Sequence, residues 1–312
     1  MAHPGEDIAA VPVDLVIERI RRVYGSWNRS TSVAQMRSDW DTAFERCTVP
    51  VSCQRVSADG VDGEWIAPTN AQHDKAVLYF HGGGFRLGSV SSHRDLIARI
   101  ADASGCRVLA INYRLAPEHR FPAPVEDALT AYHWMLEQGF KPENVAFAGD
   151  SAGGNLVLAA MLSLRARGLP LPAAGVLMSP WTDLAATGAS YVSRADADPI
   201  HQRPMILALA KNYLGEGGDP SDPLASPLYA ELTGLPPLLI QVGDRETVLD
   251  DSLLLAAKAR AAGVEVELQV WDGMIHVFQM FAAELADGRR AIGSIAQFLT
   301  RHLQMTADRR PW

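Results

Sequence analysis

The chain has 312 residues, of which 48% are hydrophobic and 21% are charged, and its formal net charge is −8. This length and composition are typical of a globular protein that can bury one large core or two smaller ones. The acidic balance leaves no basic stripe that could neutralise phosphates, so we expect no nucleic-acid partner and no binding to anionic membrane surfaces.

The N-terminal residues and the cysteines favour a cytoplasmic protein. The first 22 residues lack the basic segment, apolar run and small-residue cleavage site of a secretory signal. No later stretch has the roughly 18 uninterrupted apolar residues of a membrane span. Cys47, Cys53 and Cys106 show no C-x-x-C spacing, which favours neither a disulfide framework nor a zinc cluster. We therefore expect a cytoplasmic location, no membrane span and no metal site.

Two helices and a hairpin are predicted at the N-terminal end. Apolar residues recur with a period near 3.6 in residues 13–27 and again in residues 32–46, which predicts two amphipathic helices. Residues 49–68 then alternate between polar and apolar side chains around Asp-Gly pairs. This alternation predicts an antiparallel hairpin.

From residue 75 onward, short apolar runs alternate with helical patterns. The runs span residues 75–80, 107–113, 144–149, 173–179, 236–243 and 264–270. The helical patterns span residues 93–105, 124–139, 153–168, 250–263 and 291–304. Short apolar runs separated by helices are typical of parallel strands that are covered on both faces. The order predicts an α/β protein with a doubly wound, mostly parallel sheet.

Residues 184–228 interrupt this alternation. They contain one helical pattern, at 203–214, between flanks rich in Gly, Pro, Ser and Asp. We expect an insertion over the C-terminal edge of the sheet that forms a lid together with the N-terminal helices. The predicted organisation is cap helices in 1–46, a core in 47–183 and 229–312, and a cap insertion in 184–228.

A nucleophile is predicted at Ser151. The segment Gly149-Asp150-Ser151-Ala152-Gly153 fits the G-x-S-x-G pattern and stands between a predicted strand and a predicted helix. A tight turn at this place lifts the serine hydroxyl out of the backbone and needs small residues two positions before and after it. The alternative is a glycine-rich helix start that only packs closely on its strand.

A second glycine-rich segment, H-G-G-G-F at residues 81–85, follows the first predicted parallel strand. Successive glycines lose much backbone entropy on folding, so a close approach or unusual dihedral angles must require them. Uncrowded N–H groups can stabilise the oxyanion of a tetrahedral acyl intermediate. We predict such an oxyanion hole from Gly82, Gly83, Gly84 and the N–H of Ala152. A phosphate-binding loop is disfavoured because neither G-x-G-x-x-G nor G-K-[ST] follows.

His276 is the predicted general base. It follows the last predicted strand and precedes the last predicted helix, where a Ser, acid, His chain order places the base. The alternative is a half-buried histidine in an apolar cluster. His81 is predicted to support the glycine loop, and His119 and His201 come too early in the chain order and are interpreted as structural or lid residues.

With these motifs the chain resembles the hormone-sensitive-lipase-like (bacterial family IV) esterases of the α/β-hydrolase superfamily. The matching stretches lie between about residues 75 and 300 and read HGGGF, YRLAPEHRFPAPVED, GDSAGGNL, SPWTDL and DGMIHVF. The resemblance implies an α/β-hydrolase fold with an eight-stranded sheet and a helical cap. It also implies hydrolysis of short- to medium-chain carboxylic esters without a cofactor, and a homodimer formed through the last strand and its neighbouring helix.

Two residues are candidates for the acid of the site. In the family it commonly follows the seventh strand, four residues before an acidic pair, and Asp250 and Asp251 match that pair. The resemblance therefore implies Glu246 as the acid, with Asp244, directly after the strand, as the alternative. Because Asp250 and Asp251 open a predicted helix, we expect their carboxylates to cap its free N–H groups.

The predicted reaction is acyl transfer from an ester to water. Ser151 attacks the carbonyl, His276 takes its proton, and Glu246 orients the imidazole. A non-catalytic small-molecule receptor of the same fold and an amide or formamide hydrolase are the alternatives. The predicted supporting residues are His81, Asp150 and Asp244. The predicted pocket residues are Phe85, Trp40, Met205, Ile206 and Ile275.

Overall fold

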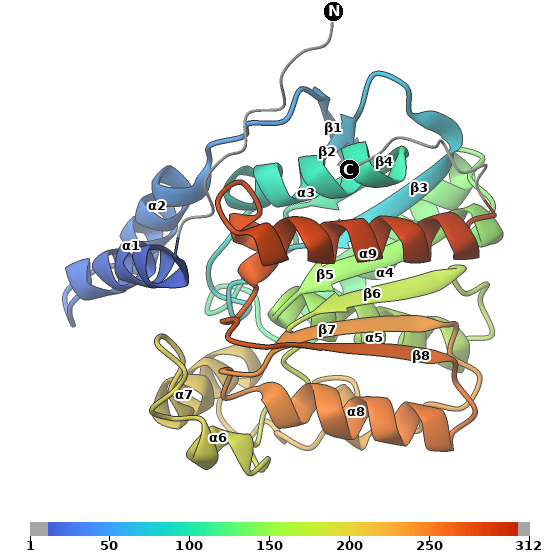
Figure 1. The fold of residues 1–312 in the computed structure, drawn as a ribbon. Helices are drawn as coiled ribbons and strands as arrows, with labels where there is room; N and C mark the ends of the chain where they lie inside the picture. Colours follow the sequence, from blue (N-terminus) through green and yellow to red (C-terminus); the bar gives the residue numbers. More distant parts are fainter. Residues whose placement is uncertain (1–11, 305–312) are drawn as a thin grey trace, which may run out of the picture.

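The computed structural model describes residues 12–304, so residues 1–11 of the predicted segment 1–46 and residues 305–312 of the predicted segment 229–312 lie outside the described residues. Within them the strands form one eight-stranded sheet in the order β1-β2-β4-β3-β5-β6-β7-β8 (Figure 1). The strands are β1 Ser52–Ala58, β2 Val61–Ala67, β3 Gln72–Phe80, β4 Cys106–Ile111, β5 Val145–Asp150, β6 Ala174–Met178, β7 Leu238–Gly243 and β8 Val266–Trp271. The pairs β1–β2 and β2–β4 are antiparallel and the others are parallel, which confirms the predicted mostly parallel sheet.

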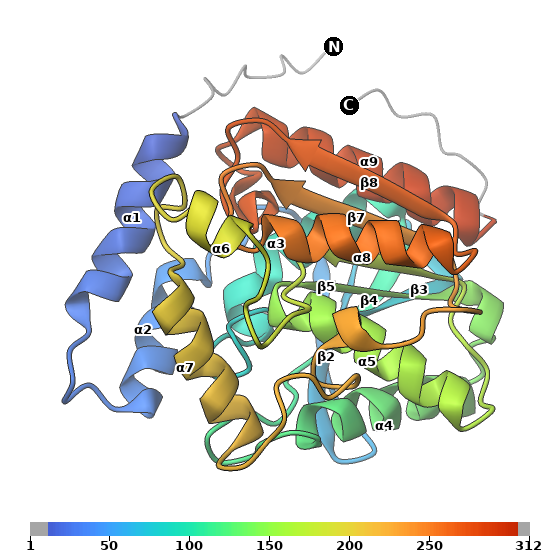
Figure 2. The same ribbon diagram turned by 90° about the horizontal axis from the view of Figure 1, so that it is seen from below.

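Helices cover both faces of the sheet (Figure 2). One face carries α3 Val90–Ser104 and α9 Ala286–His302, and the other carries α4 Ala123–Glu137, α5 Ala152–Ala166 and α8 Leu249–Ala261. Side chains of β3 alternate between the two resulting cores: Leu78 and Phe80 pack with α4 and α5, whereas Val77 and Tyr79 pack with α3 and α9. This alternation follows from the two-residue repeat of a strand. None of the helices in residues 12–304 is both long and apolar enough to cross a membrane.

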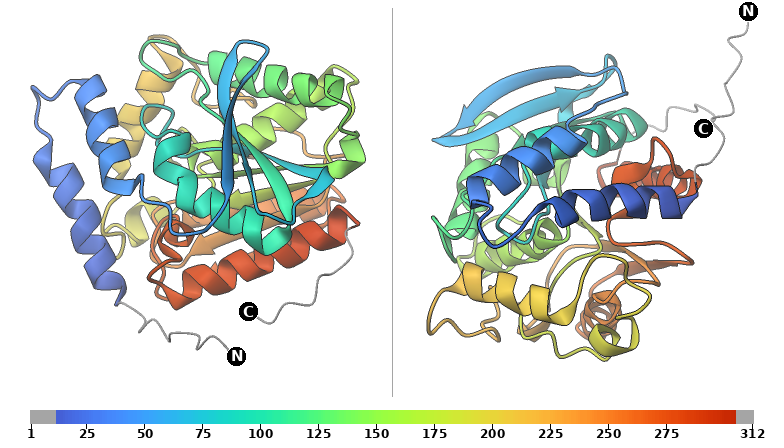
Figure 3. Two further views of the ribbon diagram at one scale, coloured as in Figure 1. Left: turned by 90° about the horizontal axis from the view of Figure 1, so that it is seen from above. Right: turned by 90° about the vertical axis from the view of Figure 1, so that its left-hand side faces the viewer.

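Four further helices lie across the end of the molecule at which the parallel strands finish (Figure 3). They are α1 Val13–Ser26 and α2 Val33–Phe44, which were predicted, and α6 Ser190–Ser193 and α7 Arg203–Leu214 from the insertion. The helical pattern at 203–214 predicted α7, whereas α6 is too short for a periodic signal. The Nε of Arg21 donates to the Pro199 carbonyl at 3.1 Å and joins α1 to the insertion. Arg37 of α2 donates to the Arg86 carbonyl at 2.9 Å and pairs with Glu118 at 2.7 Å.

The acidic pair at the start of α8 binds the insertion and the two residues directly before it. Asp250 Oδ2 accepts from the Ser190 N–H at 2.9 Å, and Asp251 Oδ2 accepts from the N–H groups of Thr182 and Asp183 at 2.7 and 2.8 Å. The N-cap residue Val248 makes no side-chain hydrogen bond to α8, and the first-turn N–H of Asp250 donates to the Ser190 hydroxyl at 3.0 Å. The prediction that Asp250 and Asp251 cap their own helix is therefore wrong, because both carboxylates instead satisfy the amides of a segment far away in the chain.

Candidate active site

Ser151 stands at the turn between β5 and α5. Its backbone has φ 53° and ψ −118°, an unfavourable combination for a residue with a side chain. The turn is tight: a β-carbon on Gly149 would collide with the Gly153 carbonyl, and one on Gly153 would collide with the Phe80 carbonyl. The G-x-S-x-G pattern thus has a steric cause here, and the turn presents the Ser151 hydroxyl to a cavity.

Ser151, His276 and Glu246 form a hydrogen-bonded chain. The His276 Nε2 lies 2.9 Å from Ser151 Oγ, and its Nδ1 lies 2.7 Å from Glu246 Oε2. Because an ionised carboxylate only accepts, the imidazole carries its proton on Nδ1 and Nε2 can accept the serine proton. His276 is 8% exposed and Glu246 is fully buried. Burial lowers the pKa of His276, but the adjacent Glu246 carboxylate outweighs this and the pKa lies above its usual value.

Glu246 is held by two further donors. Its Oε1 accepts from the Ser179 hydroxyl at 2.8 Å and from the Gly243 N–H at 2.5 Å. Ser179 Oγ in turn accepts from the Val277 N–H at 3.0 Å, so it joins the loop of the acid to the loop of His276. Our interpretation of the sequence missed this role of Ser179. A hydroxyl directly after β6, the strand beside the nucleophile strand, was the available signal.

Asp244, the alternative acid, points elsewhere. Its Oδ1 accepts from the Gly273 N–H at 2.8 Å and supports the turn after β8. Glu246 has one more methylene than Asp244 and lies two residues further along the chain. It follows a turn in which its own N–H donates to the Gly243 carbonyl at 3.4 Å. The structure therefore brings Glu246, and not Asp244, to His276.

The glycine loop leaves donors free near Ser151. Gly83 has φ 116° and Gly84 has φ 63°, and within the described residues neither N–H donates to a protein acceptor. Ala152 is the first residue of α5, where the N–H has no partner inside the helix. These three N–H groups can donate hydrogen bonds to an oxygen that develops negative charge. Gly82 does not belong with them, because its N–H already donates to Asp150 Oδ1 at 3.1 Å; the prediction for Gly82 is corrected accordingly.

His81 supports this loop. Its Nδ1–H donates to the Gly82 carbonyl at 2.8 Å, and its ring stacks on Tyr113 with centroids 4.4 Å apart. The Tyr113 hydroxyl donates to the His81 carbonyl at 2.6 Å. Burial lowers the pKa of His81 to about 3, so the ring is neutral at ordinary pH. These contacts agree with a supporting role and not with a general base.

Asp150 forms a buried ion pair with His93, a histidine that our interpretation of the sequence did not select. Its Oδ2 lies 3.4 Å from His93 Nε2, and its Oδ1 accepts from the Tyr79 hydroxyl at 2.6 Å. Burial opposes the charge on both groups. The pairing outweighs burial, so the pKa of Asp150 lies below its usual value and that of His93 lies above it.

Asp150→Asn is expected to reduce the free energy of unfolding by about 3 kcal/mol, because it leaves a buried charge without its partner. The stabilisation by His93 is full below its ordinary pKa of 6.5 and is lost as pH rises through its raised folded value. The stabilisation by Asp150 is full above its ordinary pKa of 3.8 and is lost as pH falls through its lowered folded value. The difference between wild type and variant should therefore be largest between these two ordinary values.

Urea unfolding between these two pH values and at more alkaline pH measures the difference. The control is Glu137→Gln, which removes the exposed partner of His133 and should leave stability unchanged. A loss in Asp150→Asn that did not shrink toward alkaline pH would contradict the ion pair.

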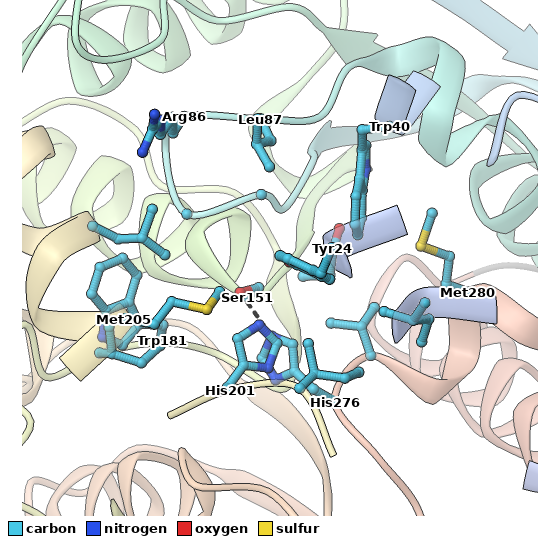
Figure 4. A pocket seen from close by; sticks show the side chains of 18 of the residues that line it. Tyr24, Trp40, Arg86, Leu87, Ser151, Trp181, His201, Met205, His276 and Met280 are labelled. Carbon is cyan, nitrogen blue, oxygen red and sulfur yellow. Dashed lines mark hydrogen bonds between the residues drawn. The ribbon is translucent and has the colours of Figure 1, made fainter. Parts of the chain in front are cut away.

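A cavity of about 240 Å³ lies over Ser151 (Figure 4). Its wall includes Tyr24 and Trp40 from α1 and α2, His201, Met205 and Ile206 from the insertion, and Trp181, His276 and Met280 from the core. The predicted pocket residues Trp40, Met205 and Ile206 lie in this wall.

The predictions that Phe85 and Ile275 line the pocket are wrong. The Phe85 ring is fully buried and stacks on Tyr213 with centroids 3.8 Å apart. Ile275 is fully buried in an apolar cluster beneath α1. In both cases the side chain packs into a core next to the cavity and does not reach its wall.

The two histidines interpreted as structural or lid residues differ in position. His119 is exposed. His201 packs its ring against His276, with centroids 4.3 Å apart.

Several known proteins that are similar to this chain are named hydrolases or esterases. Residues 77–280 match the family model of the alpha/beta hydrolase fold. The chain is 43% identical over 296 residues to an acetyl-hydrolase of Streptomyces hygroscopicus, covering 94% of this chain and 97% of that one. It is 32% identical over 235 residues to an ethyl acetate hydrolase of Pseudomonas putida, covering 73% of each.

A solved structure gives the same result. The crystal structure of an esterase from the bacterial hormone-sensitive lipase family has a TM-score of 0.90 and 46% identity, covering 97% of this chain and all of that one. The resemblance stated from the motifs is thereby confirmed. The chain belongs to the hormone-sensitive-lipase-like branch of the α/β-hydrolase superfamily, a family of carboxylic ester hydrolases.

Proposed function

We propose that this esterase cleaves short- to medium-chain carboxylic esters through an acyl-enzyme on Ser151. The observation that carries the proposal is the chain of hydrogen bonds from Ser151 through His276 to Glu246, with distances of 2.9 and 2.7 Å. A hydroxyl activated by a base, with the base oriented by a third group, is the arrangement that nucleophilic acyl transfer requires.

In the first half-reaction Ser151 Oγ attacks the ester carbonyl carbon and its proton passes to His276 Nε2. The carbonyl oxygen becomes negative and receives hydrogen bonds from the N–H groups of Gly83, Gly84 and Ala152. When the tetrahedral intermediate collapses, the bond to the alkoxy oxygen breaks and His276 returns the proton to that oxygen, so the alcohol leaves.

In the second half-reaction a water molecule attacks the acyl-enzyme. His276 Nε2 takes a proton from the water, and the same three N–H groups stabilise the second oxyanion. The bond to Ser151 Oγ then breaks, the proton returns to that oxygen, and the carboxylic acid is released. Glu246 stabilises the imidazolium in both halves without itself accepting the proton.

The size and lining of the cavity support a preference for small acyl groups. The space is about 240 Å³ and its wall is largely apolar, and the relatives include an acetyl-hydrolase and an ethyl acetate hydrolase. Methylenes that extend beyond the cavity stay in water and contribute no burial energy.

We expect kcat/KM for p-nitrophenyl esters to be highest with acetate or butyrate and lower by at least about tenfold with laurate. Each methylene that fits or fails to fit a pocket changes the binding free energy of the transition state by only a small amount. Met205→Ala should move the optimum toward longer chains because it enlarges the cavity. Leu169→Ala, an exposed position outside the cavity wall, is the control and should leave the series unchanged. A flat series, or a laurate optimum in the wild type, would contradict the proposed preference.

The same assay separates the alternative functions. Faster turnover of the matching p-nitroanilides than of the esters would favour an amide hydrolase. Ligand binding without turnover would favour a receptor. The hydrogen-bonded chain of Ser151, His276 and Glu246 argues against that function, because a receptor does not need it.

We further propose that the helices before residue 47 and the insertion 184–228 act as a cap that encloses the acyl group, because both contribute to the cavity wall. A homodimer through β8, which lies at the edge of the sheet, and a cytoplasmic location stay predictions.

A further inference from the structure

His201 reaches His276 from the insertion, where it precedes α7 by two residues. The two rings meet edge to face, with centroids 4.3 Å apart and an angle of 67° between planes (Figure 4). Both ring nitrogens of His276 are already engaged, by Ser151 and Glu246. The contact with His201 therefore restrains the plane of the imidazole without competing for its hydrogen bonds.

One carboxylate of the insertion holds both His201 and the loop of the triad acid. Asp198 is 3% exposed. Its Oδ2 accepts from the N–H and the hydroxyl of Thr247, at 2.9 and 3.1 Å. Its Oδ1 accepts from the N–H groups of Ile200 and His201, at 2.9 and 2.8 Å. Because Thr247 directly follows Glu246, Asp198 links the position of His201 to that of the acid.

Two more hydrogen bonds strengthen the same junction. The Ser190 hydroxyl donates to the Thr247 carbonyl at 2.6 Å, and the Arg245 Nε donates to the Ala197 carbonyl at 3.1 Å. The segment that carries Glu246 is thus held by the insertion on both of its sides.

The charges around His276 favour its protonated form. The carboxylates of Glu246, Asp198 and Asp150 raise the pKa of His276, in order of decreasing effect. Burial raises the pKa of Asp198, but His201 and the donated hydrogen bonds outweigh this, so the carboxylate is ionised. Tyr24, which is half-buried near Asp198, has a pKa above its usual range because of desolvation and the nearby Asp198 carboxylate, so it carries no charge.

His201 adds no positive charge to this environment. Burial, together with the nearby His276, lowers the pKa of His201 to about 4. At the pH at which His276 accepts a proton, the ring beside it is neutral and does not repel the imidazolium.

We propose that Asp198 and His201 are positioning residues for His276, so that the insertion completes the catalytic centre of the hydrolase core. His201 restrains the imidazole plane, and Asp198 supplies a second negative charge while anchoring the loop of Glu246. The inference rests on the proposed function, in which His276 is the base.

The first experiment measures the pKa of His276 by NMR titration of the full chain in a Ser151→Ala background. Asp198→Asn should lower this pKa by about half a unit to one unit, a three- to tenfold change in the protonation constant. Asp196→Asn, an exposed acid of the same loop, is the matched control and should change nothing. Thr247→Val, which removes one hydrogen bond and keeps the charge, should also leave the pKa in place. An unchanged pKa in Asp198→Asn would overturn the role of Asp198.

The second experiment separates positioning from cavity lining by kinetics. His201→Ala should lower kcat by about tenfold with a smaller change in KM, since the imidazole plane is then free, and His201→Phe should recover most of kcat because a ring is restored. If His201→Ala raised KM at unchanged kcat, His201 would be only a wall residue and the proposal for it would fail.

The two proposals fail in different ways. A wild-type chain without ester turnover would refute the proposed function, whereas the NMR titration would still show whether Asp198 acts on His276.

Discussion

Ser151→Ala is expected to lower kcat for p-nitrophenyl butyrate by at least about 10⁴-fold, because no other group near the ester can form the acyl-enzyme. The N–H groups of Gly83, Gly84 and Ala152 remain, so weak residual hydrolysis by water should persist. KM should change little, since the hydroxyl contributes almost nothing to the cavity wall.

Steady-state kinetics with matched unfolding curves provides the measurement. The unfolding midpoint should stay near that of wild type, which shows that the loss is chemical. Ser193→Ala, at an exposed serine of the insertion, is the control and should retain full activity. Full activity in Ser151→Ala would contradict the proposed nucleophile.

Glu246→Gln is expected to lower kcat by about 10³- to 10⁴-fold, because the amide cannot stabilise the imidazolium and favours the wrong tautomer of His276. The pH dependence should change as well. The carboxylate raises the pKa of His276, so its removal lowers that pKa and moves the acid limb of kcat/KM to lower pH.

Asp244→Asn is the matched comparison, because it neutralises the other acid of the same loop. It should change kcat by less than about threefold, since its carboxylate contacts Gly273 and not His276. Near-normal turnover in Glu246→Gln together with a large loss in Asp244→Asn would reverse the assignment of the acid.

The sequence predicted those features that depend on local pattern. Apolar runs and helical periods predicted the strands and helices because burial on one or both faces leaves a repeat in the chain. Ser151 and His276 were predicted because each follows a strand in a fixed chain order, and the structure places their side chains in hydrogen-bond contact. Glu246 was reached only through the resemblance, since nothing in its immediate surroundings separates it from Asp244.

The features that were missed depend on contacts between distant segments. Ser179 and His93 acquire their roles from partners that lie 67 and 57 residues away, respectively, and no periodicity records such pairings. Asp250 and Asp251 failed as helix caps for the same reason, because their carboxylates accept hydrogen bonds from amides of the distant 182–190 segment.

The backbone conformation that exposes the Ser151 hydroxyl lowers the stability of the fold. A residue with φ 53° and ψ −118° costs on the order of 1–3 kcal/mol unless it is glycine. Glycine would fit this turn best, but glycine has no hydroxyl that could serve as the proposed nucleophile. The surrounding core, above all the packing of β5 and α5, must hold the serine in this conformation. Part of the free energy gained by packing the sheet therefore offsets the strain of the Ser151 backbone.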